Sequence, residues 1–236
     1  LLTVPAFCLP VSAEEGSSAP VQKQGVVVQN VLHRDAVKGG VHKLFYNWIW
    51  CGILDATTGR PTRERKMITK HIVVEPFDEH WRLDFLKIQN ELTDALGQLA
   101  IRIEHVGSTS VQGLSAKPII DIDVVIKDYN ALEDTISALE KIGYQYEGDL
   151  GIPGREAFRY DGKDHLKKHH LYVCPAGSPE LKGHIAFRNY LRTHPDAVRK
   201  YSLIKEEGAK KYPDDIERYI EYKSPFIEGI YSEIGI

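Results

Sequence analysis

The chain has 236 residues, of which 42% are hydrophobic and 27% are charged, and its formal net charge is -3. This length accommodates one large domain or two small ones, and the weak negative charge argues against a nucleic-acid-binding surface, so no nucleic-acid partner is expected. The three cysteines are too few and too scattered for a disulfide framework or a cysteine-rich zinc site. No apolar run reaches the roughly 20 residues that span a membrane, so no membrane contact is expected.

Residues 1–70 read as a poorly defined N-terminal extension, and the preferred interpretation of its first residues is a disordered tail. Residues 11–13 resemble the cleavage site of a signal or transit peptide, but the positively charged start of such a peptide is missing. His33, Arg34 and residues 41–43 stand ahead of an aromatic segment. Through them the chain from about residue 25 faintly resembles the opening of a Nudix hydrolase, without the glutamate-rich helix that holds the Nudix metal. No Nudix activity is therefore inferred. Separately, the low cysteine content leads us to expect a cytoplasmic location for the rest of the chain.

From His71 the pattern of apolar residues becomes regular. Residues 72–74 predict a short strand that Pro76 ends. Asp78 predicts the cap of a helix that runs to about Leu96, and Gly97 ends it. Residues 101–106 alternate as a strand does.

A glycine turn at Gly107 and Ser108 follows, and after it comes a second strand that carries Asp121 and Asp123. Residues two apart on a strand point to the same face, so the two carboxylates are expected side by side, with the neighbouring isoleucines directed into a core. Two adjacent carboxylates repel each other, and a divalent cation between them relieves the repulsion. The pair is therefore a candidate metal site.

The rest of the chain predicts one more helix, three strands and a helical end. Residues 130–142 are amphipathic and stop at Gly143, and the strands are expected at residues 144–147, 157–160 and 170–173, the last two joined as a hairpin. Pro195 and Pro213 divide residues 180–235 into three helices, each proline being suited to a first helical turn. Strands followed by helices predict an α+β fold.

The order of strand, Gly-Ser turn, short helix and Asp-x-Asp strand resembles the nucleotidyltransferase superfamily, the fold of polymerase β. The resemblance implies a mixed sheet with flanking helices. It also implies that Gly107 and Ser108 bind the phosphates of a nucleoside triphosphate, while Asp121 and Asp123 bind Mg²⁺.

At the level of a single family, residues 104–122 are similar to the signature of the GrpB family, and so are residues 151–155, 169–171, 184–192 and 222–227. The resemblance covers residues 71 to 234, so residues 71–236 are predicted to form one GrpB-like domain. Members of this family occur alone or fused behind dephospho-CoA kinase. This chain lacks a Gly-x-x-x-x-Gly-Lys-Ser/Thr loop, so no such kinase domain is expected in it.

The nucleotidyltransferase pattern normally includes a third acid on a later strand, and the expected strand at residues 169–173 has none. Three alternatives stay open: His170 replaces the acid, Glu156 fills its place from the neighbouring strand, or the site is incomplete. His170 is a candidate for metal binding or proton transfer near neutral pH.

Several basic side chains are candidates for phosphate contacts, because arginine forks match phosphate oxygens and lysine supplies a compact positive charge. The family resemblance makes a phosphate-facing row plausible for residues 184, 188 and 192, which are spaced by four as on one helix face. The candidates are Lys117, Arg155, His184, Arg188 and Arg192.

Two functional hypotheses follow. The first is an enzyme that binds Mg²⁺ and a nucleoside triphosphate and transfers a nucleotidyl group to a small acceptor. The second is a binding or folding-assistance module that has kept the fold and lost catalysis, with a protein partner.

Overall fold

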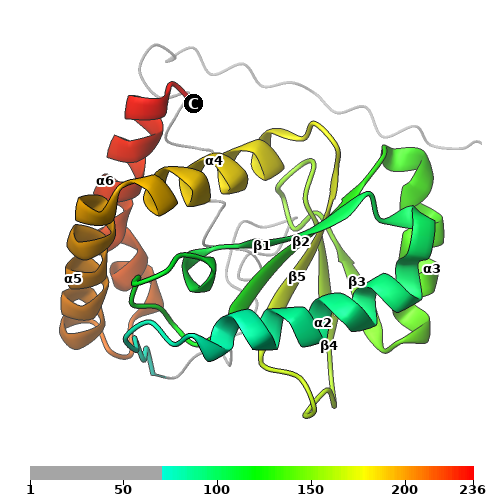
Figure 1. Cartoon of the computed structure of the whole chain (residues 1–236), viewed down its shortest axis with the longest axis horizontal. Coiled ribbons are helices and arrows are strands. Elements are labelled where there is room, and N and C mark those ends of the chain that lie inside the picture. The colour runs from blue at the N-terminus through cyan, green and yellow to red at the C-terminus, as the bar shows by residue number, and fades with distance from the viewer. Residues whose placement is uncertain (1–70) are drawn as a thin grey trace, which may run out of the picture. The chain divides into compact units, whose positions relative to one another are not determined.

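A computed structural model describes residues 71–236, and the expectations for residues 1–70 lie outside this range. The described part contains five longer helices and five strands (Figure 1). The helices are α2 (His80–Leu96), α3 (Leu132–Lys141), α4 (Pro179–Thr193), α5 (Pro195–Lys211) and α6 (Ile216–Ile234). The strands are β1 (Arg102–Val106), β2 (Ile120–Ile126), β3 (Tyr144–Gly148), β4 (Glu156–Tyr160) and β5 (His169–Pro175).

The strands form one mixed sheet in the order β1-β2-β5-β4-β3. β2 runs parallel to β5 and antiparallel to β1, and β4 runs antiparallel to both β3 and β5. The predicted α+β class is confirmed, and so is the β4–β5 hairpin. β2 is an inner strand with side chains packed on both of its faces, which explains why most of its residues are buried.

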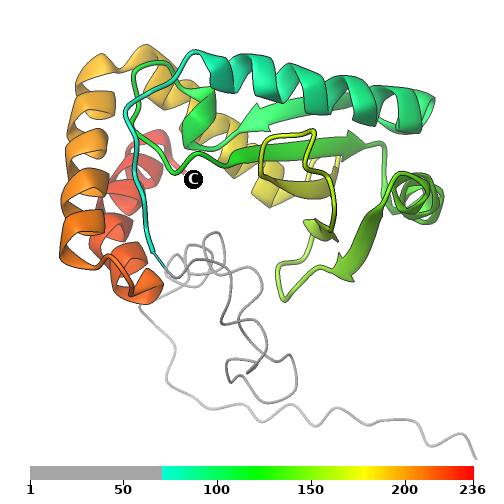
Figure 2. The same ribbon diagram turned by 90° about the horizontal axis from the view of Figure 1, so that it is seen from below.

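The two faces of the sheet carry different helices. Ile120, Ile122 and Val124 face a core that includes the apolar side of α2 and Leu139 of α3. Val125 packs instead against Leu181 of α4 on the opposite face. Helices α4, α5 and α6 share a second apolar cluster, and Figure 2 shows α5 and α6 side by side beyond one end of the sheet.

Two local predictions are wrong. Residues 72–74 form no strand with any described residue, since the sheet-like contact of this segment is an isolated bridge between Glu75 and Ala116, and Ile72 N bonds to Pro213 O at 2.6 Å. Pro213 also precedes α6 instead of lying in its first turn, because Asp215 caps that helix by accepting from Arg218 N. Pro195 does begin α5, as predicted.

None of the helices in the described part of the chain is long and apolar enough to cross a membrane.

Candidate functional site

The turn after β1 brings Gly107 against the first aspartate of β2. Gly107 has φ 67° and ψ -172°, a region that residues with a side chain rarely adopt. A Cβ atom on this residue would lie only 2.1 Å from Asp121 Oδ2. Glycine is therefore required here for the close approach of the carboxylate as well as for the backbone conformation. Ser108 follows at the start of a short 3-10 helix, Ser108–Ser110.

Asp121 is the accessible member of the carboxylate pair. Its side chain is 32% exposed, and the His170 side chain beside it is 40% exposed. His170 Nδ1 lies 2.9 Å from Asp121 Oδ1, because parallel pairing of β2 with β5 puts the two residues opposite each other. Burial acts to raise the pKa of Asp121. The hydrogen bond and charge of His170, together with the charges of His105 and His184, outweigh burial and lower the pKa.

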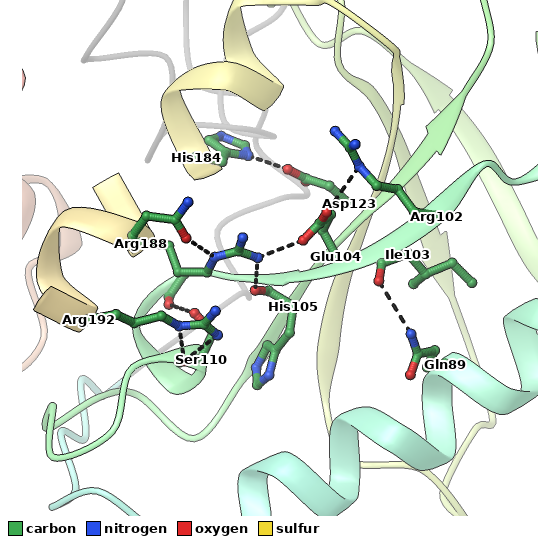
Figure 3. Close-up of polar contacts among 12 residues, drawn as sticks. Gln89, Arg102, Ile103, Glu104, His105, Ser110, Asp123, His184, Arg188 and Arg192 are labelled. Atoms are coloured by element: carbon green, nitrogen blue, oxygen red, sulfur yellow. Dashed lines mark hydrogen bonds and ion pairs between the residues drawn. The ribbon is translucent and has the colours of Figure 1, made fainter. Parts of the chain in front are cut away.

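Asp123 shares the face of Asp121 but has a different environment. Its side chain is fully buried, and His184 Nδ1 of α4 lies 2.6 Å from its Oδ2 (Figure 3). The two carboxylates thus stand on one side of β2 as predicted, one accessible beside His170 and one enclosed beside His184. Among the described residues, no group of three or more His, Cys, Asp or Glu side chains is arranged to hold a metal ion.

Sequence reasoning missed Glu104, which lies directly opposite Asp123 on β1 and therefore on the same face. Arg188 Nη1 of α4 donates to Glu104 Oε2 at 2.7 Å, and Arg102 Nε lies 3.0 Å from Oε1 (Figure 3). The acid is thus neutralised by two guanidinium groups. The alternation of residues 102–106 indicates which of them share a face with Glu104. It does not predict which residue of β2 pairs with Glu104, because a long irregular segment joins the two strands.

The predicted row of basic residues on α4 contacts protein groups. His184 bonds to Asp123, and Arg188 donates to Glu104 and to the His105 carbonyl. Arg192 donates from Nε and Nη2 to the Ser110 carbonyl (Figure 3). The row holds α4 against β1, β2 and the turn between them, and it therefore positions the carboxylates.

The structure does not bring Glu156 to the two aspartates, which corrects one of the alternatives for the third acid. Glu156 is opposite Val173, and Val173 is opposite Val124, so its side chain is on the other face of the sheet from Asp123. There its oxygens accept from the hydroxyls of Tyr129 and Tyr146. The reason is the twofold alternation of strands, in which a shift of one residue changes the face.

Arg155, one residue earlier, is on the Asp123 side and is fully buried. Its guanidinium carbon lies 4.4 Å from the ring centre of Tyr172, the residue that pairs with Asp123 on β5. Arg155 Nε and Nη2 have no hydrogen-bond partner among the described residues. The backbone of Arg155 precedes β4, but its guanidinium lies over Tyr172 of β5, the strand next to β2. No hydrogen bond among the described residues links it to the Gly107 turn.

Lys117 precedes β2 and is half-buried. Burial lowers the pKa of its ammonium group, and the negative charge of Asp121 opposes this change. By its place in the chain, Lys117 lies just before the end of β2 that carries Asp121, the accessible carboxylate.

Comparison with known proteins identifies the family. The model of the family described as GrpB protein matches residues 71–233. The chain belongs to the GrpB family. A solved relative, the conserved protein GrpB from Enterococcus faecalis, is 33% identical, with a TM-score of 0.61 over 68% of this chain and 96% of that one.

Other relatives of this GrpB domain are longer. UPF0157 protein YqkA of Bacillus subtilis is 33% identical over 152 residues, which are 64% of this chain and 44% of that protein. A dephospho-CoA kinase of Mycolicibacterium paratuberculosis is 25% identical over 190 residues, which are 71% of this chain and 47% of that protein. The chain thus spans less than half the length of these two relatives, and the GrpB domain occurs within a chain named as a kinase.

Proposed function

We propose that the GrpB domain binds a nucleoside triphosphate together with Mg²⁺ at the Asp121 end of the sheet. The observation that carries the proposal is the contact of the Asp121 carboxylate with the Gly107 turn. The turn has no side chain to keep an anionic ligand away from the backbone, and the carboxylate beside it is accessible. Lys117, which is half-buried just before β2, supplies a positive charge that the charge of Asp121 favours.

The donor set fits one magnesium ion that arrives with the nucleotide. Mg²⁺ is usually held by one or two carboxylates, with phosphate oxygens and water completing its coordination. Asp121 is suited to this role because the pKa of its carboxyl group is lowered, so the carboxylate is ionised at neutral pH. His170 Nδ1 contacts Oδ1 of the same carboxylate. When bound, the ion would neutralise charge on the phosphates.

A second ion at Asp123 is not supported by the residues. The carboxylate is enclosed and bonded to the buried His184, so a ligand could reach it only after α4 moved away from β2. The described acids therefore fit nucleotide binding better than the two-metal chemistry of polymerases.

Nucleotidyl transfer is the second candidate, and the pairing of His170 with Asp121 favours it. A carboxylate that accepts from Nδ1–H orients an imidazole so that its other nitrogen can act as a general base. His170 would take the proton from an acceptor hydroxyl while the hydroxyl oxygen bonds to the α-phosphorus and pyrophosphate leaves.

The alternative is a binding or folding-assistance module without turnover. The lack of a third acid on β5 and the similarity to a dephospho-CoA kinase support this alternative.

Calorimetry on the full chain tests nucleotide binding. The four ribonucleoside triphosphates would be titrated with and without Mg²⁺, and Asp121→Asn is expected to weaken the magnesium-dependent affinity at least about tenfold, which is about 1.4 kcal/mol. Asp94→Asn, an exposed change on α2, serves as the control. Equal affinities of the wild type and Asp121→Asn would overturn the proposal.

Transfer is tested by pyrophosphate release with a panel of small hydroxyl acceptors. His170→Gln is expected to abolish release while nucleotide affinity stays within a factor of about three of the wild type. Turnover that survives this change would exclude His170 as the base, and the absence of turnover in the wild type across the panel would favour the binding module.

A further inference from the structure

Arg155, directly before β4, is a buried cation without a matching anion. Its residue is 0% exposed, and its guanidinium forms no ion pair with any residue of the described part of the chain. A buried lysine can lose its proton, but a guanidinium stays charged in proteins, so this positive charge is permanent. A permanent buried charge is strongly unfavourable unless it is paired, and the position of Arg155 therefore requires an explanation.

The donors that Arg155 leaves unused form one edge of its guanidinium. Nε and Nη2 have no hydrogen-bond partner among residues 71–236. Nη2 is the terminal nitrogen on the side of the Nε hydrogen, so Nε–H and one Nη2–H point in the same direction. Two parallel N–H bonds of this kind match two oxygens of a carboxylate or a phosphate.

A series of short contacts joins Arg155 to the Asp121 site. The ring centre of Tyr172 lies 4.4 Å from the guanidinium carbon and 6.4 Å from the ring centre of His170. His170 Nδ1 in turn lies 2.9 Å from Asp121 Oδ1. His170 and Tyr172 are two residues apart on β5, so the three side chains follow one another along one face of the sheet. Tyr172 is half-buried, and a single ring therefore separates the enclosed guanidinium from the accessible His170.

The acids on this face do not neutralise Arg155. Asp123 is opposite Tyr172, but its Oδ2 is engaged by His184, and its buried Oδ1 has no hydrogen-bond partner in the described part of the chain. Burial raises the pKa of Glu180, in the first turn of α4, although the charges of His184 and Arg155 oppose this change. A group that satisfied this region would have to offer acceptors to Arg155 and a donor to Asp123.

We propose that Arg155 binds the oxyanion of a small hydroxylated ligand, whose hydroxyl donates to Asp123 Oδ1. Two oxygens of the anion accept from Nε–H and Nη2–H. One ligand of this class thus satisfies polar atoms on two neighbouring elements that the protein leaves without partners. The binding site stands by itself, and only its use rests on the proposed function: a second hydroxyl that reaches His170 makes the ligand the acceptor of nucleotidyl transfer.

Four small probes test the chemistry of the ligand. Glycerate and glycerol 3-phosphate carry an oxyanion and hydroxyls, propionate lacks the hydroxyl, and glycerol lacks the charge. Each is titrated into the full chain at constant ionic strength, with chloride as the reference anion, and the melting temperature is measured. Glycerate or glycerol 3-phosphate should raise it, and the stronger of the two identifies the oxyanion as carboxylate or phosphate. Melting temperatures equal to that in chloride for both would overturn the inference, and propionate as effective as glycerate would overturn the contact with Asp123.

Variants of Arg155 test the position of the site. Arg155→Met removes the charge and should weaken the binding of the more effective probe at least about tenfold. It should also raise the melting temperature in chloride alone, because an unpaired buried charge is removed. Arg159→Met, an exposed change on β4, should alter neither quantity. Unchanged probe affinity in Arg155→Met would overturn the inference. If Arg155→Met does not fold, Arg155→Lys decides, since lysine keeps the charge and loses the fork, and an affinity equal to that of the wild type would overturn the proposal.

The failure of this site can be distinguished from the failure of the nucleotide site. If Asp121→Asn leaves magnesium-dependent ATP binding unchanged while Arg155→Met loses the probe, the nucleotide site fails and the Arg155 site stands. The opposite pair of results overturns the Arg155 site alone. Pyrophosphate release that the probe stimulates in the wild type, and that Arg155→Met loses while it keeps nucleotide affinity, supports the ligand as acceptor. Release that no bound probe stimulates would overturn that assignment.

Discussion

At the scale of single residues, the surrounding side chains give the two aspartates of β2 different properties. Asp121 lies beside a partly exposed histidine, and Asp123 beside a buried one. The spacing in the sequence predicts only that both share a face. Which of them can meet a ligand depends on α4, whose His184 encloses Asp123.

The turn at Gly107 leads to a prediction about the same site. Gly107→Ala should lower the free energy of unfolding by more than the roughly 1 kcal/mol expected for a non-glycine residue at positive φ, because the new methyl group would also displace Asp121. Denaturant unfolding and nucleotide titration would measure the two effects.

Gly162→Ala is the matched control, since Gly162 has φ 69° and a Cβ added there would meet no described atom within 4 Å. It should show the backbone strain alone and keep nucleotide binding. Equal losses of stability in the two variants, with binding intact in both, would mean that the close contact with Asp121 has no energetic consequence.

At the scale of elements, the helical boundaries follow local chemistry well. Gly97 ends α2 with φ 50°, Pro195 starts α5, and Ser178 caps α4 by accepting from Leu181 N. Residues 72–74 resemble a strand in composition, yet no strand of the described part pairs with them. A strand exists only when another backbone pairs with it, and this is a tertiary condition.

The packing of α5 on α6 gives an element-scale prediction. A Cβ on Gly208 would lie 2.9 Å from Tyr222 Cδ1 and 3.2 Å from Tyr219 Cδ2, whereas a Cβ on Gly229 of α6 would meet no described atom within 4 Å. Gly229→Ala should therefore raise stability by up to about 1 kcal/mol through helix propensity. Gly208→Ala should lower it, because the buried Tyr219 cannot move away.

Thermal unfolding of both variants measures the difference. The expected order of melting temperatures is Gly229→Ala above the wild type and Gly208→Ala below it. A Gly208→Ala protein that is as stable as Gly229→Ala would show that α5 and α6 are less closely packed than their geometry implies.

At the scale of the whole molecule, the pairing of strands in the sheet buries His169 of β5 against tyrosines of β3 and β4. His169 begins β5, and its Nδ1–H donates to the Lys167 carbonyl while its Nε2 accepts from the Tyr144 hydroxyl, both at 2.8 Å. The ring also stacks on Tyr160. Burial lowers the pKa of His169 from 6.5 to about 4, so the neutral ring is the folded form.

This arrangement predicts a loss of stability in acid. Below pH 6.5 the unfolded chain binds a proton that the folded chain takes up only near pH 4. The free energy of unfolding therefore decreases as the pH is lowered from 6.5 to 4, by up to roughly 3 kcal/mol for one group. His169→Gln should flatten the dependence between pH 6.5 and 4, measured by denaturant midpoints. Parallel curves for the variant and the wild type would contradict this prediction.

The sequence by itself determined the class of fold, the family and the residues on one face of β2, because periodicity, glycine turns and long family motifs are local properties. It also predicted the row on α4, although not that these side chains contact Glu104, Asp123 and Ser110. Only the tertiary structure decided that Glu156 is on the opposite face, and that Asp123 is enclosed while Asp121 is accessible. These features depend on strand register and helix packing, which join residues far apart in the chain and leave no local pattern.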